Sequence, residues 1–162
     1  CVAHNLCRCQ PGFTGDDCSI AMNTCVASPS AGQLSAGGLK GRYFLDELLV
    51  QSRFERVDSR VNFDWGYGTP ALPVNVTTFP SDHFSVSWSG YLRADRTGWH
   101  TIYISGDQIA RLWLNRETYI RDTGSFSVSV YLVAQQFYEI FLDMIETTGP
   151  ARVSLQWTPL KK

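Results

Sequence analysis

The chain has 162 residues, 44 % of them hydrophobic and 13 % aromatic, which suits one medium domain with a core plus a small additional module. Charged residues make up only 18 %, and the net charge is −1, so no basic face for a nucleic acid is expected. No apolar run reaches the length that a membrane-spanning helix requires, so membrane insertion is not expected either. Because the chain begins with cysteine rather than methionine, we expect a mature or trimmed segment.

Residues 1–25 contain many turn formers and almost no apolar periodicity, so they cannot build a core of their own. All the cysteines of the chain fall in this segment: Cys1, Cys7, Cys9, Cys18 and Cys25. Such crowding predicts a disulfide framework formed in an oxidising, extracellular compartment. A metal site is the alternative, but the spacing of Cys7 and Cys9 is too tight for a pair of zinc ligands.

The next segment, residues 26–38, has a different composition. It consists mostly of Ala, Ser, Gly and Pro and carries no charge. This composition is typical of a flexible or extended spacer, so we expect a linker here.

From residue 39 onward, apolar and polar side chains alternate in short runs separated by Gly, Asp, Asn and Pro. Period-2 runs of this kind predict antiparallel strands with one buried face, and several of them in succession predict a sandwich or barrel. The clearest runs are 84–89, 102–104, 126–132, 137–144 and 152–157. Residues 44–57 are the one stretch whose leucines are loosely spaced for a helix.

Residues 7–18 follow the pattern C-x-C-x-x-G-aromatic-x-G-x-x-C, which resembles the C-terminal half of an EGF-like module. The resemblance implies a small loop closed by Cys9 and Cys18. It also places Cys1 as the third of six cysteines, so Cys1 and Cys7 would pair with residues upstream of this chain. Cys25 is left over, and its partner is Cys1, Cys7, another segment or another chain. Residues 1–25 are therefore expected to be a partial EGF-like module of a longer polypeptide.

Several strings in the second segment together resemble the protective-antigen-type (PA-fourteen) domain. They are 38–44, 61–66 followed by Pro70, 84–92, 97–103, 106–107 with 111–115, and 149–157. The resemblance implies a mainly β fold, an antiparallel β-sandwich or barrel over residues 39–160, whose loops hold ligands.

In the sugar-binding members of that family, two adjacent aspartates hold a calcium ion that coordinates sugar hydroxyls. The matching pair in this chain is Asp107-Gln108, so one carboxylate is replaced by an amide. Calcium prefers six to eight oxygen ligands, and losing one charge lowers the expected affinity. Asp107 and Gln108 are nevertheless the candidate metal ligands, with calcium as the candidate cofactor. The alternative for Asp107 is an ordinary turn residue.

Aromatic side chains supply further candidates. Trp65 and Tyr67 lie in a Gly-rich loop, where they could stack on a sugar or fill a partner's pocket, or simply pack on the sandwich. Trp88, Trp113 and Trp157 fall on or beside apolar strand positions, which favours core packing. Asn75 begins an Asn-Val-Thr sequon and is a candidate glycosylation site.

No catalytic arrangement is apparent in the sequence. The three histidines are scattered, and Asp143 and Glu146 are expected at a solvated strand edge rather than facing each other across a cleft. We therefore expect a non-catalytic extracellular or cell-surface module that contacts other subunits, or copies of itself, as in a filament or adhesive surface. A calcium-dependent lectin or adhesin domain that binds glycans is the alternative. An accessory domain of a surface enzyme stays open as a third possibility.

Overall fold

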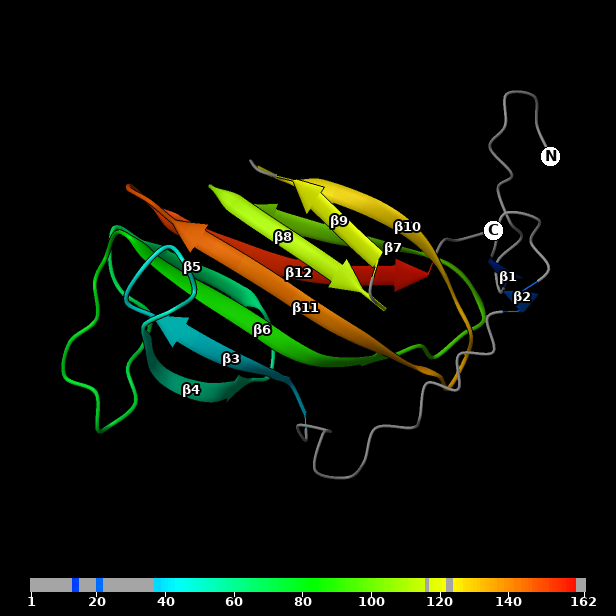
Figure 1. The fold of residues 1–162 in the computed structure, drawn as a ribbon, viewed down its shortest axis with the longest axis horizontal. Helices are drawn as coiled ribbons and strands as arrows, with labels where there is room; N and C mark the ends of the chain where they lie inside the picture. Colours follow the sequence, from blue (N-terminus) through cyan, green and yellow to red (C-terminus); the bar gives the residue numbers. More distant parts are fainter. Residues whose placement is uncertain (1–12, 15–19, 22–36, 116, 122–123, 160–162) are drawn as a thin grey trace.

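The structure is a computed structural model, which describes residues 13–14, 20–21, 37–115, 117–121 and 124–159 (Figure 1). Its strands are β1 (Phe13–Thr14), β2 (Ile20–Ala21), β3 (Leu39–Phe44), β4 (Ser52–Asp58), β5 (Asn62–Gly66), β6 (Phe84–Arg93), β7 (Gly98–Gly106), β8 (Ile109–Leu114), β9 (Glu117–Arg121), β10 (Phe126–Leu132), β11 (Phe137–Glu146) and β12 (Ala151–Pro159). The residues described contain no helix, and so none that could cross a membrane.

Ten of the strands form two antiparallel sheets that pack face to face. One sheet has the strand order β10-β7-β12-β5, and the other has the order β4-β3-β6-β11-β8-β9. Figure 1 shows β7 and β12 crossing behind β8 and β11, as expected for a sandwich. The predicted fold class, a mainly β antiparallel sandwich, is confirmed. The separate pair β1–β2 belongs to the segment expected to be EGF-like, whose cysteines lie outside the described residues.

The alternation in the sequence produces the core directly. On β6 the side chains of Phe84, Val86 and Trp88 are fully buried. Its neighbour β11 places Leu142 opposite Trp88 and Met144 opposite Val86, so both strands point their apolar residues between the sheets. Similar residues from β7 and β12 close the core from the other side. Each of these large side chains adds about 1.5–3 kcal/mol by leaving water.

The helix considered for residues 44–57 is wrong. The chain makes a loop after β3 and returns as β4, with Leu48 and Val50 largely exposed. The carboxylate of Asp46 stabilises this loop by accepting the backbone N–H groups of Leu48 and Gln51, at 2.7 and 2.5 Å. The strand lets Phe54 stack on the ring of Tyr43 at 4.4 Å inside the core, which a helix would not allow.

A buried carboxylate ties three strands of the larger sheet together. Asp58, at the end of β4, accepts hydrogen bonds from the Tyr43 hydroxyl and the Trp88 indole, both at 2.7 Å, and from Arg56 at 2.6 Å. A Cβ at Gly41 would lie 2.6 Å from the Asp58 carboxylate, so a glycine is needed there. Burial raises the pKa of Tyr43 far above its usual range, which keeps its hydroxyl protonated and donating.

Four connections meet at one end of the sandwich, and this loop end is the surface that the sequence singled out. It comprises the β3–β4 loop (45–51), the β5–β6 loop (67–83), the β7–β8 turn (107–108) and the β11–β12 turn (147–150). In Figure 1 the long β5–β6 loop extends to the left of the sheets, while β12 runs away toward the right.

Candidate functional site

The loop end is held together by hydrogen bonds between its connections. Asp82 accepts the backbone N–H of Gly149 at 3.0 Å, and the N–H of His83 donates to the Thr147 carbonyl, also at 3.0 Å. The His83 ring lies 2.6 Å from the carboxylate of Glu47, which joins the β3–β4 loop to the same group. These hydrogen bonds connect the loops to one another, so the loops form a single surface.

Gln108 lies at the centre of this surface, and its carboxamide is fully used. The Nε2 group donates to Glu146 Oε1 at 2.8 Å and to the carbonyl of Thr148. The Oε1 atom accepts from the backbone N–H of Thr147 at 2.9 Å and from the Thr147 hydroxyl. Because Thr147 N–H can only donate, this network fixes which end of the amide faces Glu146. The side chain thus joins the β7–β8 turn to the β11–β12 turn.

Glu146 is the last residue of β11 and is completely buried. Its Oε2 atom has no hydrogen-bond partner among the described residues. Burial, together with the nearby carboxylates of Asp82, Asp107 and Glu47, raises the pKa of Glu146 to about 7, while His83 opposes the shift. A buried carboxylate among like charges therefore takes up its proton at a pH well above the range that is usual for glutamate.

This shift predicts that stability falls as the pH rises through the neutral range. The pKa of Glu146 rises from an ordinary value of 4.5 to about 7 on folding, so the folded state binds the extra proton between these values. The stabilisation is complete below the lower value and is lost as the pH approaches the upper one. Urea unfolding at about pH 5 and about pH 8 should show that Glu146 costs the chain about 2 kcal/mol at the higher pH.

The variant Glu146→Gln isolates this contribution from the other titrating groups. Its carboxamide cannot ionise, so the difference in unfolding free energy between variant and wild type should grow as the pH rises, in favour of the variant. An identical pH dependence in the two proteins would contradict the assignment to Glu146.

Asp107 faces a cation that the protein itself supplies. Its Oδ2 lies 3.8 Å from the guanidinium of Arg152, which also pairs with Asp64 at 3.1 Å. Its backbone N–H donates to the Arg152 carbonyl at 3.4 Å, as in an ordinary strand-to-strand turn. Both carboxylates raise the pKa of Arg152 above its usual value, so the guanidinium stays charged.

As arranged here, the residues do not fit a calcium ion. The amide oxygen of Gln108 already accepts two donors, and its NH₂ group points at Glu146 Oε1 and the Thr148 carbonyl, oxygens of the kind that a cation would attract. In the described part of the chain, no three His, Cys, Asp or Glu side chains are placed to hold a metal ion. Calcium binding by Asp107 and Gln108 stays a prediction that needs a direct measurement.

The structure separates the two aromatic candidates of the β5–β6 region. Trp65, on β5, is partly buried: it stacks on Phe63 at 4.9 Å and meets Phe84 edge-on at 5.9 Å. Tyr67 follows it by two residues and is 80 % exposed. Trp65 thus packs against the core, whereas Tyr67 projects from the loop end and is available to a partner.

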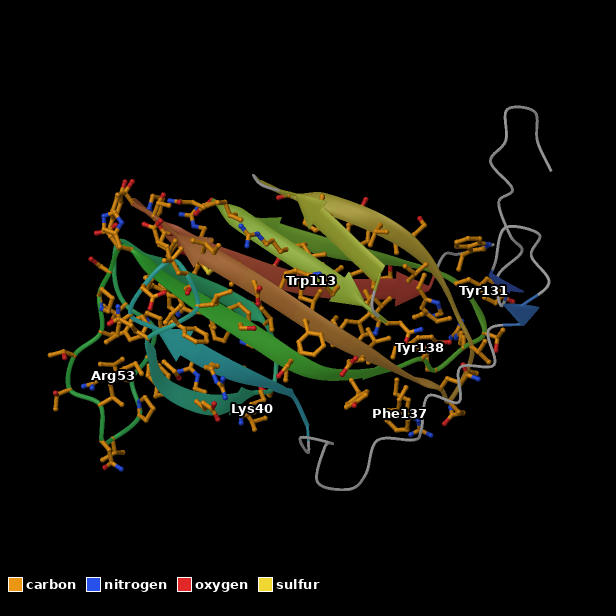
Figure 2. All side chains as sticks on the ribbon, viewed as in Figure 1. Lys40, Arg53, Trp113, Tyr131, Phe137 and Tyr138 are labelled. Atoms are coloured by element: carbon orange, nitrogen blue, oxygen red, sulfur yellow. The ribbon has the colours of Figure 1, made fainter. Side chains whose placement is uncertain are left out.

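The other tryptophans do not share one environment. Trp88 is fully buried, as expected, but Trp113 is only partly buried and Trp157 is 46 % exposed. Trp113 falls on an outward position of β8, and Figure 2 labels it on the near sheet. Core packing is therefore wrong for Trp157, which is largely exposed, and for Trp113, which is partly buried on the outer face. Asn75 is exposed in the β5–β6 loop, where its side chain is accessible for glycosylation.

Asp143 and Glu146 do not form a solvated edge. Both are buried, Asp143 on the outward face of β11 and Glu146 on the inward face, so they point in opposite directions. Burial raises the pKa of Asp143, while Ser87 and Arg111 oppose the change. The sequence contained a sign that Glu146 faces inward, because residue 146 continues the inward-facing series of Leu142 and Met144 on β11.

Residues 35–162 match the PA14 domain family, and the chain belongs to it. It is 27 % identical over 129 residues to the anti-sigma-I factor RsgI3 of Acetivibrio thermocellus, covering 76 % of this chain and 19 % of that protein. Among solved structures, an anti-sigma factor domain-containing protein from Clostridium clariflavum is 31 % identical with a TM-score of 0.68, covering 76 % of this chain and 42 % of that one.

The fold is also shared with the epithelial adhesin 6 A domain of Candida glabrata, solved in complex with Galb1-3GlcNAc. The identity is 17 %, the TM-score is 0.64, and the match covers 83 % of this chain and 84 % of the adhesin domain. At this identity the likeness shows the fold alone. The chain spans less than half of the two anti-sigma proteins that it matches.

Proposed function

We propose that this chain is a non-catalytic extracellular module of a larger secreted or surface protein, and that it contacts a cell-surface or protein partner through its loop end. The observation that carries the proposal is the supported loop surface with Tyr67 at its rim. Leu48 and Val50, both more than 70 % exposed, project from the adjacent β3–β4 loop. Exposed aromatic and apolar side chains on a fixed scaffold are the usual anchors of a binding surface.

Assembly with protein partners agrees with the segment expected to be EGF-like and with its odd number of cysteines. The comparisons support a binding role as well, because an adhesin domain solved with a sugar shares this fold. The alternative is calcium-dependent glycan binding at the same end. It rests on the match of Asp107 and Gln108 to the aspartate pair of the family's sugar-binding members, while the present orientation of the Gln108 amide disfavours it.

Retention on coated beads tests the proposal. We expect beads that carry a Galb1-3GlcNAc polymer, or the chain itself, to retain the wild-type chain, and Tyr67→Ala to lower that retention by about fivefold or more. Val57→Ala is the matched control, because Val57 is a 53 % exposed apolar residue on β4, away from the loop end. Equal retention of both variants on both probes would refute a role for the loop end. Repeating the assay with EDTA separates the calcium-dependent alternative.

A further inference from the structure

The two outer faces of the sandwich differ sharply in charge. The outward positions of the six-stranded sheet carry both signs of charge, from Lys40, Arg42, Glu55, Arg93, Arg111, Glu139 and Asp143. On the four-stranded sheet, the outward positions of β7 and β10 carry none, and the charges on β12 and β5 are Arg152 and Asp64, which pair with each other near the loop end. The sequence alternation alone does not reveal this segregation, because it depends on which strands share a sheet.

We name the uncharged surface the hydroxyl face. It consists of the outward residues Trp99, Thr101, Tyr103 and Ser105 of β7, Ser127, Ser129 and Tyr131 of β10, and Ser154, Gln156 and Thr158 of β12. Nearly all of these side chains end in a hydroxyl, an amide or an aromatic ring. The face therefore offers many neutral donors and acceptors around a few large rings.

The aromatic residues of the hydroxyl face are accessible. Trp99 is 50 % exposed, Tyr103 47 % and Tyr131 40 %, although each belongs to a regular strand. Trp99 and Tyr131 are opposite one another and meet edge-on at 5.7 Å, so they form one pair. Tyr103 lies four residues further along the same strand as Trp99, about 13 Å away at the usual rise of a strand.

We propose that the hydroxyl face binds a neutral polysaccharide laid along β7, with its sugar rings stacked on Trp99 and Tyr103. A sugar ring presents C–H groups on its faces and hydroxyls around its rim, so it matches aromatic rings flanked by neutral hydrogen-bonding groups. Ser129 and Thr158, on either side of the buried Thr101, supply such groups between the rings, and Ser127 supplies one beside Tyr103. A spacing of about 13 Å exceeds the width of one sugar ring, which favours a chain over a monosaccharide.

The composition disfavours a second copy of the chain as the occupant. Serine is depleted from protein–protein interfaces, and their buried centres are apolar. The hydroxyl face has four outward serines on its three strands, and no aliphatic side chain lies among its outward residues. The absence of charge likewise disfavours an acidic polysaccharide, for which a basic surface would be expected.

The inference rests on the proposed function only in that both describe a binding module, because Trp99 and Tyr131 lie at the opposite end of the sandwich from Tyr67. Tyr131 is labelled in Figure 2 at the end of the sandwich remote from Arg53 of β4. Tyr67 belongs to the loop end, whereas Trp99 and Tyr131 lie where β7 begins and β10 ends. Variants of one surface therefore leave the other intact.

Native affinity electrophoresis of the 162-residue chain tests the proposal. The probes are hydroxyethyl cellulose, galactomannan and arabinoxylan, with polygalacturonate as the acidic comparator. We expect at least one neutral polysaccharide to retard the wild type, and Trp99→Ala and Tyr103→Ala each to weaken that retardation about tenfold or more. Phe141→Ala is the matched control, because Phe141 is a 40 % exposed aromatic on the outer face of the other sheet.

Ser129→Glu provides a variant that removes no packing. It places a charge at an exposed position between the rings and should weaken retardation as strongly, with unchanged thermal unfolding. The proposal is overturned if no neutral polysaccharide retards the wild type, if Phe141→Ala weakens binding as much as Trp99→Ala, or if Trp99→Ala instead abolishes a dimer seen by sedimentation. Loss of retardation with Tyr67→Ala alone would move sugar binding to the loop end and support the proposed function instead.

Discussion

Replacing Asp58 by alanine should lower the free energy of unfolding by about 3–5 kcal/mol, the largest effect that we expect from a single change of a polar residue. Asp58 is 6 % exposed and accepts hydrogen bonds from Tyr43, Trp88 and Arg56. Without it, a buried hydroxyl and a buried indole N–H lose their acceptor, and the Arg56 guanidinium loses its counter-charge. Urea unfolding followed by tryptophan fluorescence measures the loss, and Trp88 reports on the site itself.

Two further substitutions show whether the charge or the shape of Asp58 matters. Asp58→Asn keeps an acceptor oxygen of the same size and should cost less, about 1–2 kcal/mol. Asp95→Ala removes a carboxylate whose side chain is 74 % exposed and should change stability by less than about 0.5 kcal/mol. If Asp58→Ala were as mild as Asp95→Ala, the buried cluster would not be a source of stability.

The larger strands were predictable because each has a clear apolar side. In β6, β10 and β12 the inward apolar residues alternate mostly with serines and other polar residues, and this pattern predicts both the strand and the face that it buries. β4 was not predictable in this way. Its inward residues are Phe54, Arg56 and Asp58, so two of three inward positions are charged and the alternation disappears. Only the three-dimensional structure shows that Tyr43 and Trp88 form hydrogen bonds with the buried carboxylate of Asp58.

The position of the candidate site was easier to predict than its chemistry. The sequence singled out Asp107 and Gln108 as the candidate pair, with a turn as the alternative for Asp107. It did not reveal that Glu146 is buried or that Arg152 lies beside Asp107. An amide can offer its oxygen to a cation or its NH₂ group to a carboxylate, and the choice depends on where Thr147 and Glu146 lie in space.

Gln108→Asp should make the connection between the β7–β8 and β11–β12 turns respond to calcium. The substitution removes the NH₂ group that faces Glu146 and places a negative charge beside Asp107 and Glu146. Without calcium, we expect the free energy of unfolding to fall by on the order of 2–3 kcal/mol, through lost hydrogen bonds and repulsion between carboxylates. About 5 mM calcium should restore part of it, because extracellular calcium modules bind with roughly millimolar Kd.

The wild type and Gln108→Asn are the comparisons that decide this prediction. Asparagine is as short as aspartate but neutral, so Gln108→Asn should lose the hydrogen bonds to the β11–β12 turn without gaining a calcium response. The wild type should unfold at the same urea concentration in calcium and in EDTA, because its Gln108 NH₂ group already satisfies Glu146 Oε1 and the Thr148 carbonyl. A wild type that calcium stabilises would show that Gln108 turns its oxygen to the ion, and would restore calcium-dependent sugar binding as the function of the loop end.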